Sequence, residues 1–157
     1  MIDCRYTVEY ETKKGWCKWW RLSFSAVEKK IVKHADGTCS QDKGHTCRKN
    51  VLRLLKDDLA KFYENNKLFD KDKKICSYFL KTIILGLWEE QSQSWADSDL
   101  LPRYVNALER TVKCLKDRNI EHFFIDSENL LDEKEISDAE LSTVTEYFQG
   151  ILTGYSE

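Results

Sequence analysis

The stretch 97–115, DSDLLPRYVNALERTVKCL, decides the fold class of this chain. Its apolar residues recur every three or four positions, the spacing that places side chains on one face of an α-helix. They are Leu101, Tyr104, Val105, Leu108, Val112 and Leu115. Asp97 is a suitable N-cap, and Pro102 lies near the first turn, where a missing backbone N–H removes no helical bond. The stretch therefore predicts an amphipathic helix with one buried face.

Four other segments have helical periodicity or helix-start signals. They are 25–33, 46–65, 77–90 and a last helix after the capping-box pattern Ser137-x-x-Glu140. In the second of them, the side chains expected to be buried are Val51, Leu54, Leu55, Leu59 and Phe62. Residues 2–10 alternate instead with the period of a strand. We therefore predict an all-α protein, a multi-helix bundle with one short N-terminal strand.

The composition restricts the class of protein further. The chain has 157 residues, enough for one domain, and a net charge of -2, with one proline and six glycines. So few turn residues argue against an all-β fold, and the balanced charge argues against a polybasic protein. There is no glycine-rich phosphate loop, no HExxH motif, no apolar run of transmembrane length and no signal-peptide pattern. We expect a protein of a reducing compartment, cytoplasmic or nuclear.

The polar segment between the first two predicted helices contains four residues of the kind that bind zinc. They are His34, Cys39, His45 and Cys47. Structural zinc prefers four imidazole or thiolate ligands, and a polar loop has too little apolar surface to fix its own conformation. The spacing is not the common CxxC arrangement. A histidine at a helix end and ordinary thiols explain the same residues, so both interpretations stay open here.

Two further groups of residues suit phosphates or a nucleotide. Lys49, Arg53 and Lys56 lie opposite the apolar face of the second predicted helix, as a phosphate-binding surface or a solvated outer face would. Ser77 and Tyr78 begin the third predicted helix, where a hydroxyl near exposed amides and an aromatic ring can bind a nucleotide. A helix cap and a core aromatic explain that pair equally.

The order of several motifs resembles the male abnormal twenty-one (Mab) family, in its C-terminal HhH/H2TH-like helical lobe. The motifs are Trp20-Arg21-Leu22-Ser23-Phe24-Ser25-x-x-Glu28-Lys29, Cys47-Arg48-Lys49, Leu54-Leu55-Lys56, Cys76-Ser77-Tyr78-x-x-Lys81-Thr82, Phe123-Phe124-Ile125 and Asn129-Leu130-Leu131. The family includes cyclic GMP-AMP synthase and its animal relatives, and the His/Cys loop is most similar to that of the synthase. The match covers about residues 16–131. Asp126 departs from it, because the family usually has proline there.

The resemblance implies a division of the chain and a set of site residues. Residues 1–15 would be an N-terminal strand or extension, and residues 16–157 a Mab-type helical domain with its His/Cys loop at 34–47. The positions that match nucleotide contacts are Arg21, Ser23, Lys56, Ser77 and Tyr78, with Tyr78 stacking on the base. The implied zinc ligands are His34 and Cys39, with His45 and Cys47 the best candidates to complete the set. Lys49 and Arg53 match basic positions near a DNA-facing surface.

The same resemblance implies a nucleotidyltransferase of innate immunity, of which this chain matches one lobe. The strand-borne acidic residues that bind magnesium in the family, and its Gly-Ser loop, have no match here. Asp70-x-Asp72 and Asp97-x-Asp99 lie in a predicted turn and a predicted helix cap, so we predict no catalytic residue and no activity of the chain by itself. We expect ATP or GTP to bind together with an upstream core. The alternative is a non-catalytic module that binds double-stranded nucleic acid or a protein partner, with no membrane involved.

Overall fold

The computed structural model describes eight segments of the chain, and the two strands among them by their backbone alone. The segments are 5–12, 15–22, 26–31, 46–66, 75–90, 94–125, 127–132 and 136–155. The chain divides into two compact units, Met1–Gly44 and His45–Glu157. Each unit is described by itself below.

The first unit contains a β-hairpin. β1 (Arg5–Thr12) and β2 (Gly15–Leu22) are antiparallel, with pairs running from Arg5 opposite Leu22 to Thr12 opposite Gly15. β1 overlaps the segment whose alternation predicts a strand, whereas the aromatic segment that forms β2 was not predicted to be one. The domain boundary expected after residue 15 follows the first residue of β2 and stays a prediction. A helical segment, 26–31, lies within the first predicted helix.

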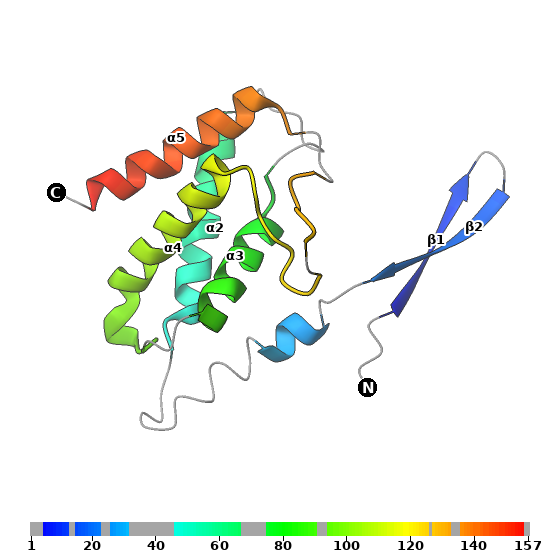
Figure 1. Cartoon of the computed structure of the whole chain (residues 1–157), viewed down its shortest axis with the longest axis horizontal. Coiled ribbons are helices and arrows are strands. Elements are labelled where there is room, and N and C mark those ends of the chain that lie inside the picture. Colours follow the sequence, from blue (N-terminus) through cyan, green and yellow to red (C-terminus); the bar gives the residue numbers. More distant parts are fainter. Residues whose placement is uncertain are drawn as a thin grey trace. The chain divides into compact units, whose positions relative to one another are not determined.

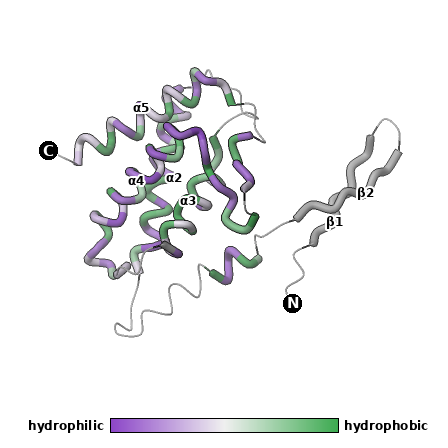
Figure 2. Tube along the Cα trace, in the orientation of Figure 1, coloured by the Kyte–Doolittle hydropathy of each residue, from purple (hydrophilic) through white to green (hydrophobic). Residues whose placement is uncertain are grey.

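The second unit is a bundle of α-helices, which confirms the predicted all-α class (Figure 1). The helices are α2 (Arg48–Asn65), α3 (Ser77–Glu90), α4 (Leu100–Lys116) and α5 (Asp138–Gly154), and a short 3-10 turn, η1 (Asp97–Asp99), directly precedes α4. α4 packs against each of the other three helices, so its apolar face lies at the centre of the core. Figure 2 shows hydrophobic and hydrophilic residues recurring along each helix, as amphipathic helices require. Among the described residues, we find no helix with the length and hydropathy of a membrane span.

The helix predicted within residues 97–115 is present as α4, with two corrections at its beginning. Its buried residues are Arg103, Tyr104, Ala107, Leu108, Thr111, Val112 and Leu115. Leu101 was expected on this face but is 55% exposed, in the first turn of α4. Asp97 was expected to cap the helix. It begins η1 instead, and the N-cap position of α4 is Asp99, whose side chain makes no capping hydrogen bond.

The buried face of α2 is rotated slightly from the one that the sequence predicts. Val51, Leu55, Leu59 and Phe62 are buried as expected. Leu54 is 38% exposed, however, and Leu52 takes its place in the core. Two helices, α3 and α4, pack against α2, so its buried face need not be centred on the single stripe that the spacing indicates.

A buried carboxylate joins three elements at one end of the bundle. Ser137 caps α5, since its side chain accepts the backbone N–H of Glu140 at 3.2 Å, which confirms half of the capping-box pattern. The Glu140 carboxylate does not turn back to Ser137. It accepts the Tyr63 hydroxyl at 2.5 Å and the Ile75 backbone N–H at 3.2 Å, so it connects α5 to the end of α2 and to the segment before α3.

Trp95 organises the other junction of the bundle. Its ring is buried, the Arg48 and Arg103 Cζ atoms each lie over it 5.6 Å from the ring centroid, and it packs edge-on against Trp88. Its backbone oxygen accepts the Cys47 N–H at 2.9 Å, and Arg103 Nε donates to the Ser94 oxygen at 2.9 Å. The segment before η1 is thereby attached to the start of α2.

Candidate functional site

Tyr78, the second residue of α3, is half-buried and has a defined position. Its hydroxyl lies 3.2 Å from His122 Nε2, and the Tyr78 and His122 ring centroids are 6.2 Å apart. Lys81 Nζ is 5.2 Å from the Tyr78 ring centroid, which places an ammonium group over the ring. An aromatic ring held by its hydroxyl and accompanied by a cation is well suited to stack on a base that carries phosphates.

A loop after α4 holds His122 in place. Residues 118–132 turn back on themselves: the His122 N–H donates to the Glu128 oxygen at 2.8 Å, and the Leu130 N–H donates to the Ile120 oxygen at 2.9 Å. The Asn129 side chain crosses the loop, because its Oδ1 accepts the Ile120 N–H at 2.9 Å and its Nδ2 donates to the Arg118 oxygen at 2.9 Å. His122 is therefore held by a backbone hydrogen bond of its own and by the pairing of the residues that precede it.

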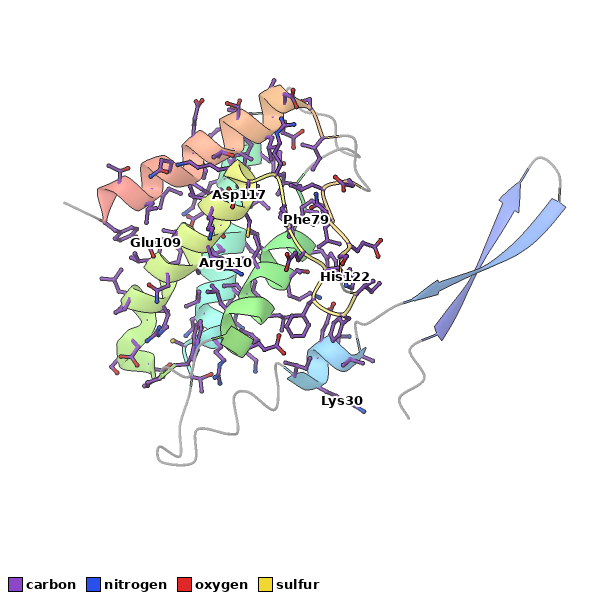
Figure 3. The ribbon with its side chains drawn as sticks, viewed as in Figure 1. Lys30, Phe79, Glu109, Arg110, Asp117 and His122 are labelled. Carbon is purple, nitrogen blue, oxygen red and sulfur yellow. The ribbon has the colours of Figure 1, made fainter. Side chains whose placement is uncertain are left out.

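A cleft of about 380 Å³ opens between α3, α4 and this loop, with His122 as part of its wall. Such a volume lies within the roughly 300–1,000 Å³ of small-molecule sites. The charged residues that line it are Glu89, Arg110, Lys113, Asp117 and Glu121. Figure 3 shows Arg110 and Asp117 along α4, with His122 in the loop that follows. The lining thus presents both signs of charge beside the aromatic ring of Phe123.

The residues that the sequence assigns to a nucleotide lie in both units. Ser77 is exposed at the first position of α3, next to Tyr78, and Lys56 is half-buried on α2, which packs against α3. Arg21 lies in β2, of which only the backbone is described, and Ser23 lies outside the described residues. The second unit therefore brings together Ser77 and Tyr78 at one helix terminus, with Lys56 on the adjacent helix.

The two basic residues assigned to nucleic acid are on the surface of α2. Lys49 and Arg53 are both exposed, one helical turn apart in the first half of the helix. Farther along, the carboxylate of Asp58 accepts the Tyr104 hydroxyl and lies 3.7 Å from Lys61 Nζ. The Asp58 carboxylate thus contacts α4 through Tyr104 and its own helix through Lys61.

Of the four predicted zinc ligands, the structure describes Cys47 alone. His34, Cys39 and His45 lie outside the described residues. Cys47 is fully buried at the start of α2, and burial raises the pKa of its thiol. Zinc binds the thiolate, so a cation beside Cys47 would have to overcome that shift. Within the described segments, we find no group of three or more His, Cys, Asp or Glu side chains that could hold a metal ion.

His122 and Lys81 are the neighbours of Tyr78 that sequence reasoning did not assign. His122 precedes the motif Phe123-Phe124-Ile125, but no helical or strand period marks its position. Its contact with Tyr78 joins residues 44 positions apart, which periodicity cannot reveal. Lys81 was in a family motif without a role. Tyr78 and Lys81 are three residues apart on one helix, a spacing that places their side chains side by side, so the sequence alone could have predicted this contact.

The helical unit, with its loop and its aromatic site, defines the class of this protein. The family model of the Mab-21 protein HhH/H2TH-like domain matches residues 47–149, and the chain belongs to that family. The resemblance found in the sequence motifs is therefore confirmed at the level of the family.

Curated relatives show which members of the family this chain is similar to. It is 36% identical over 137 residues to a cyclic GMP-AMP synthase-like receptor of Magallana gigas, covering 85% of this chain and 21% of the relative. It is 33% identical over 120 residues to the cyclic GMP-AMP synthase of Mus musculus, covering 73% of this chain and 23% of the relative. It is 31% identical over 119 residues to the cyclic GMP-AMP synthase of Sus scrofa, covering 71% of this chain and 23% of the relative. The chain thus spans less than a quarter of the length of these relatives.

Proposed function

We propose that this chain acts as the helical lobe of a cyclic GMP-AMP synthase-like nucleotidyltransferase and binds the nucleotide through Lys56, Ser77 and Tyr78. The observation that carries the proposal is the Tyr78 site, in which His122 holds the hydroxyl and Lys81 lies over the ring. The kinship with synthases and synthase-like receptors supports it. The family motif adds Arg21 and Ser23 as further proposed nucleotide contacts.

Each proposed contact has a distinct physical role. The Tyr78 ring offers a stacking surface for the base. Ser77 lies at the first turn of α3, where exposed amides and the helix dipole favour phosphate. Lys56 supplies a cation for a phosphate, and Lys81 adds a second one near the ring. Nucleotidyl transfer also needs divalent metal chemistry at the α-phosphate. We assign no such step to the residues of this chain, which bind and orient the nucleotide.

The loss of the Tyr78 ring should weaken nucleotide binding. Tyr78→Ala is expected to raise the dissociation constant of ATP or GTP about tenfold or more, because base–aromatic stacking contributes about 1–3 kcal/mol. Isothermal titration calorimetry on the purified chain measures this change. Tyr155→Ala is the matched control, since Tyr155 is an exposed tyrosine near the end of α5. Equal dissociation constants for the Tyr78 variant and the unaltered chain would contradict the proposed site.

A second candidate function is supported by the exposure of Lys49 and Arg53 on α2. A stand-alone module that binds double-stranded nucleic acid would use these two cations on backbone phosphates. The logarithm of the binding constant falls linearly with the logarithm of the salt concentration, and each phosphate contact makes that slope steeper by about 0.9. The Lys49→Ala/Arg53→Ala double variant should therefore bind duplex DNA more weakly and lower that slope by about 2.

Lys61→Ala is the matched control for the DNA experiment. Lys61 is exposed on the same helix, but it lies beside Asp58 rather than with the two proposed contacts. Fluorescence anisotropy at several salt concentrations measures all three proteins. A double variant that binds like the Lys61 control, or an unaltered chain that does not bind duplex DNA, would exclude this second function.

We also propose one structural zinc ion held by His34, Cys39, His45 and Cys47. The chemistry of the donor set supports it, since two imidazoles and two thiolates satisfy zinc in a closed tetrahedral site. Elemental analysis of the purified chain should find about one zinc per chain, and the Cys39→Ser and Cys47→Ser variants should lose it. Cys114→Ser is the control, because Cys114 is a half-buried thiol on α4 outside the set. Zinc-free protein purified without chelators would refute the site.

A further inference from the structure

Three large hydrophobic side chains are exposed in the described part of the helical unit, and all three lie near one contact. Leu54 is 38% exposed, Leu101 55% and Tyr155 51%. The contact joins α2, α4 and the end of α5: the Tyr104 hydroxyl donates to the Asp58 carboxylate, and the Tyr104 ring packs edge-on against Tyr155, with the centroids 5.7 Å apart. Leu54 lies one helical turn before Asp58, and Leu101 lies one turn before Tyr104. The three side chains therefore border the same part of the surface, here called the apolar patch.

The two leucines of the apolar patch lie on the same side of that contact. α2 and α4 run in the same direction (Figure 1), and the hydrogen bond from the Cys47 N–H to the Trp95 oxygen joins the segments in which they begin. Both leucines precede the contact along their helices, so both lie toward these beginnings. Figure 1 also shows the first turns of α4 extending past the end of α5. The apolar spacing that predicts burial for both leucines thus continues beyond the covered part of the bundle.

Carboxylates surround the apolar patch. They are Asp57, Asp58, Asp97 and Asp99. The first two follow Leu54 on α2, and the last two precede Leu101 in η1. The η1 carboxylates also lie near the start of α2, because the pKa of the Cys47 thiol, raised mainly by burial, is raised further by both of them. Two cations of α2, Arg53 and Lys61, adjoin the patch, and Lys61 lies 3.7 Å from Asp58. The border of the patch is thus acidic on balance.

We propose that the apolar patch of Leu54, Leu101 and Tyr155 is a docking surface for a basic amphipathic helix of a partner protein. Such a helix presents apolar side chains three, four and seven residues apart, which suits a hydrophobic surface formed along two helices. Its lysine and arginine residues would lie opposite the acidic border. The proposal is independent of the nucleotide site, because none of the three apolar residues belongs to that site.

The acidic border favours this occupant over others. A symmetric dimer through the apolar patch would place the same surface of two copies face to face, and carboxylates would then oppose carboxylates. Nucleic acid is repelled by the same charges. The patch itself has the composition of an interface centre, since tyrosine is enriched where proteins bind one another and charged residues gather at the rim.

Selection of peptides on the whole chain tests the proposal. The probe is a phage-displayed library of random peptides about 16 residues long, enough for four helical turns. The enriched peptides should combine apolar residues at helical spacing with a net positive charge. Fluorescence anisotropy of a synthetic, labelled copy then measures affinity. The Leu54→Ser/Leu101→Ser double variant should raise its dissociation constant about tenfold or more, because two leucines no longer bury apolar surface.

A charge reversal separates the acidic border from the apolar side chains. Asp57→Lys/Asp97→Lys should weaken the same peptide about threefold or more at low salt, since opposite charges would become like charges. Glu146→Lys is the matched control. Glu146 is exposed on α5 and nine residues before Tyr155, hence on the opposite face of that helix by the helical period, and its reversal should leave the affinity unchanged.

Each remaining outcome has a defined meaning. Circular dichroism should show that the variants fold, because all the replaced side chains are exposed. If the leucine variant unfolds, the charge-reversal pair decides. The proposal is overturned if no peptide is enriched, if the enriched peptides are acidic or uncharged, or if they bind the folded leucine variant like the unaltered chain. Light scattering that finds a dimer, abolished by Leu101→Ser, would identify a second copy as the occupant and also overturn it.

Discussion

Trp95→Ala is expected to lower the free energy of unfolding by about 3–5 kcal/mol, the usual effect of removing a large buried aromatic side chain. Trp95 is only 1% exposed. Its removal leaves a cavity beside the Arg48 and Arg103 guanidinium groups and withdraws the edge-on contact with Trp88. Two cations would then lose the aromatic ring that they contact, and desolvated cation–aromatic contacts contribute about 2 kcal/mol.

Denaturant unfolding followed by circular dichroism measures the effect of this change. Trp95→Phe is the control, because a smaller aromatic ring keeps part of the packing and an aromatic face for the two arginines. It should therefore lose clearly less stability than Trp95→Ala. A loss below about 1 kcal/mol for Trp95→Ala would place it among ordinary surface substitutions and contradict the central packing role of this residue.

Glu140→Ala is expected to destabilise the chain by about 1–3 kcal/mol, because it removes the buried carboxylate that accepts two hydrogen bonds, and the loss of a buried acceptor costs about that much. Glu140 is 2% exposed, and it accepts from the Tyr63 hydroxyl and the Ile75 N–H. Burial, followed by the hydrogen bond to Glu140, raises the pKa of Tyr63, so this tyrosine remains a donor at neutral pH.

Glu140→Gln separates the acceptor from the charge. The glutamine keeps an oxygen at the position of the acceptor, so its loss of stability should be smaller than that of Glu140→Ala, as chemical denaturation of both variants will show. Tyr63→Phe is a second control, since it removes one donor together with its need for an acceptor. Equal losses for the alanine and glutamine variants would mean that the carboxylate does not act through these hydrogen bonds.

The sequence predicts the helices of the second unit well because their stability comes from amphipathic faces. In α4, spacing alone identifies Tyr104, Leu108, Val112 and Leu115 as buried. Spacing fails where a neighbouring element ends or a turn intervenes: Leu101 extends past the core, and Asp97 enters a 3-10 turn. These errors concern helix ends, where local pattern does not report which elements are adjacent.

The candidate site was predictable only in part, and for a physical reason. Ser77 and Tyr78 stand out because they begin a helix, and the family motifs assign them a role. His122 reaches Tyr78 from a loop without periodicity, so only the folded structure reveals the contact. Trp95 is similar, since it follows a polar segment of serine and glutamine and becomes central through Arg48 and Arg103.

Backbone-amide NMR of the chain during a titration with ATP or GTP tests the central claim most directly. The account predicts saturable shifts that concentrate at Lys56, at the first turn of α3 from Ser77 to Lys81, and around His122, and that Tyr78→Ala strongly reduces. The absence of shifts at saturating nucleotide, or shifts confined to Lys49 and Arg53 in the first half of α2, would contradict a nucleotide site at Tyr78.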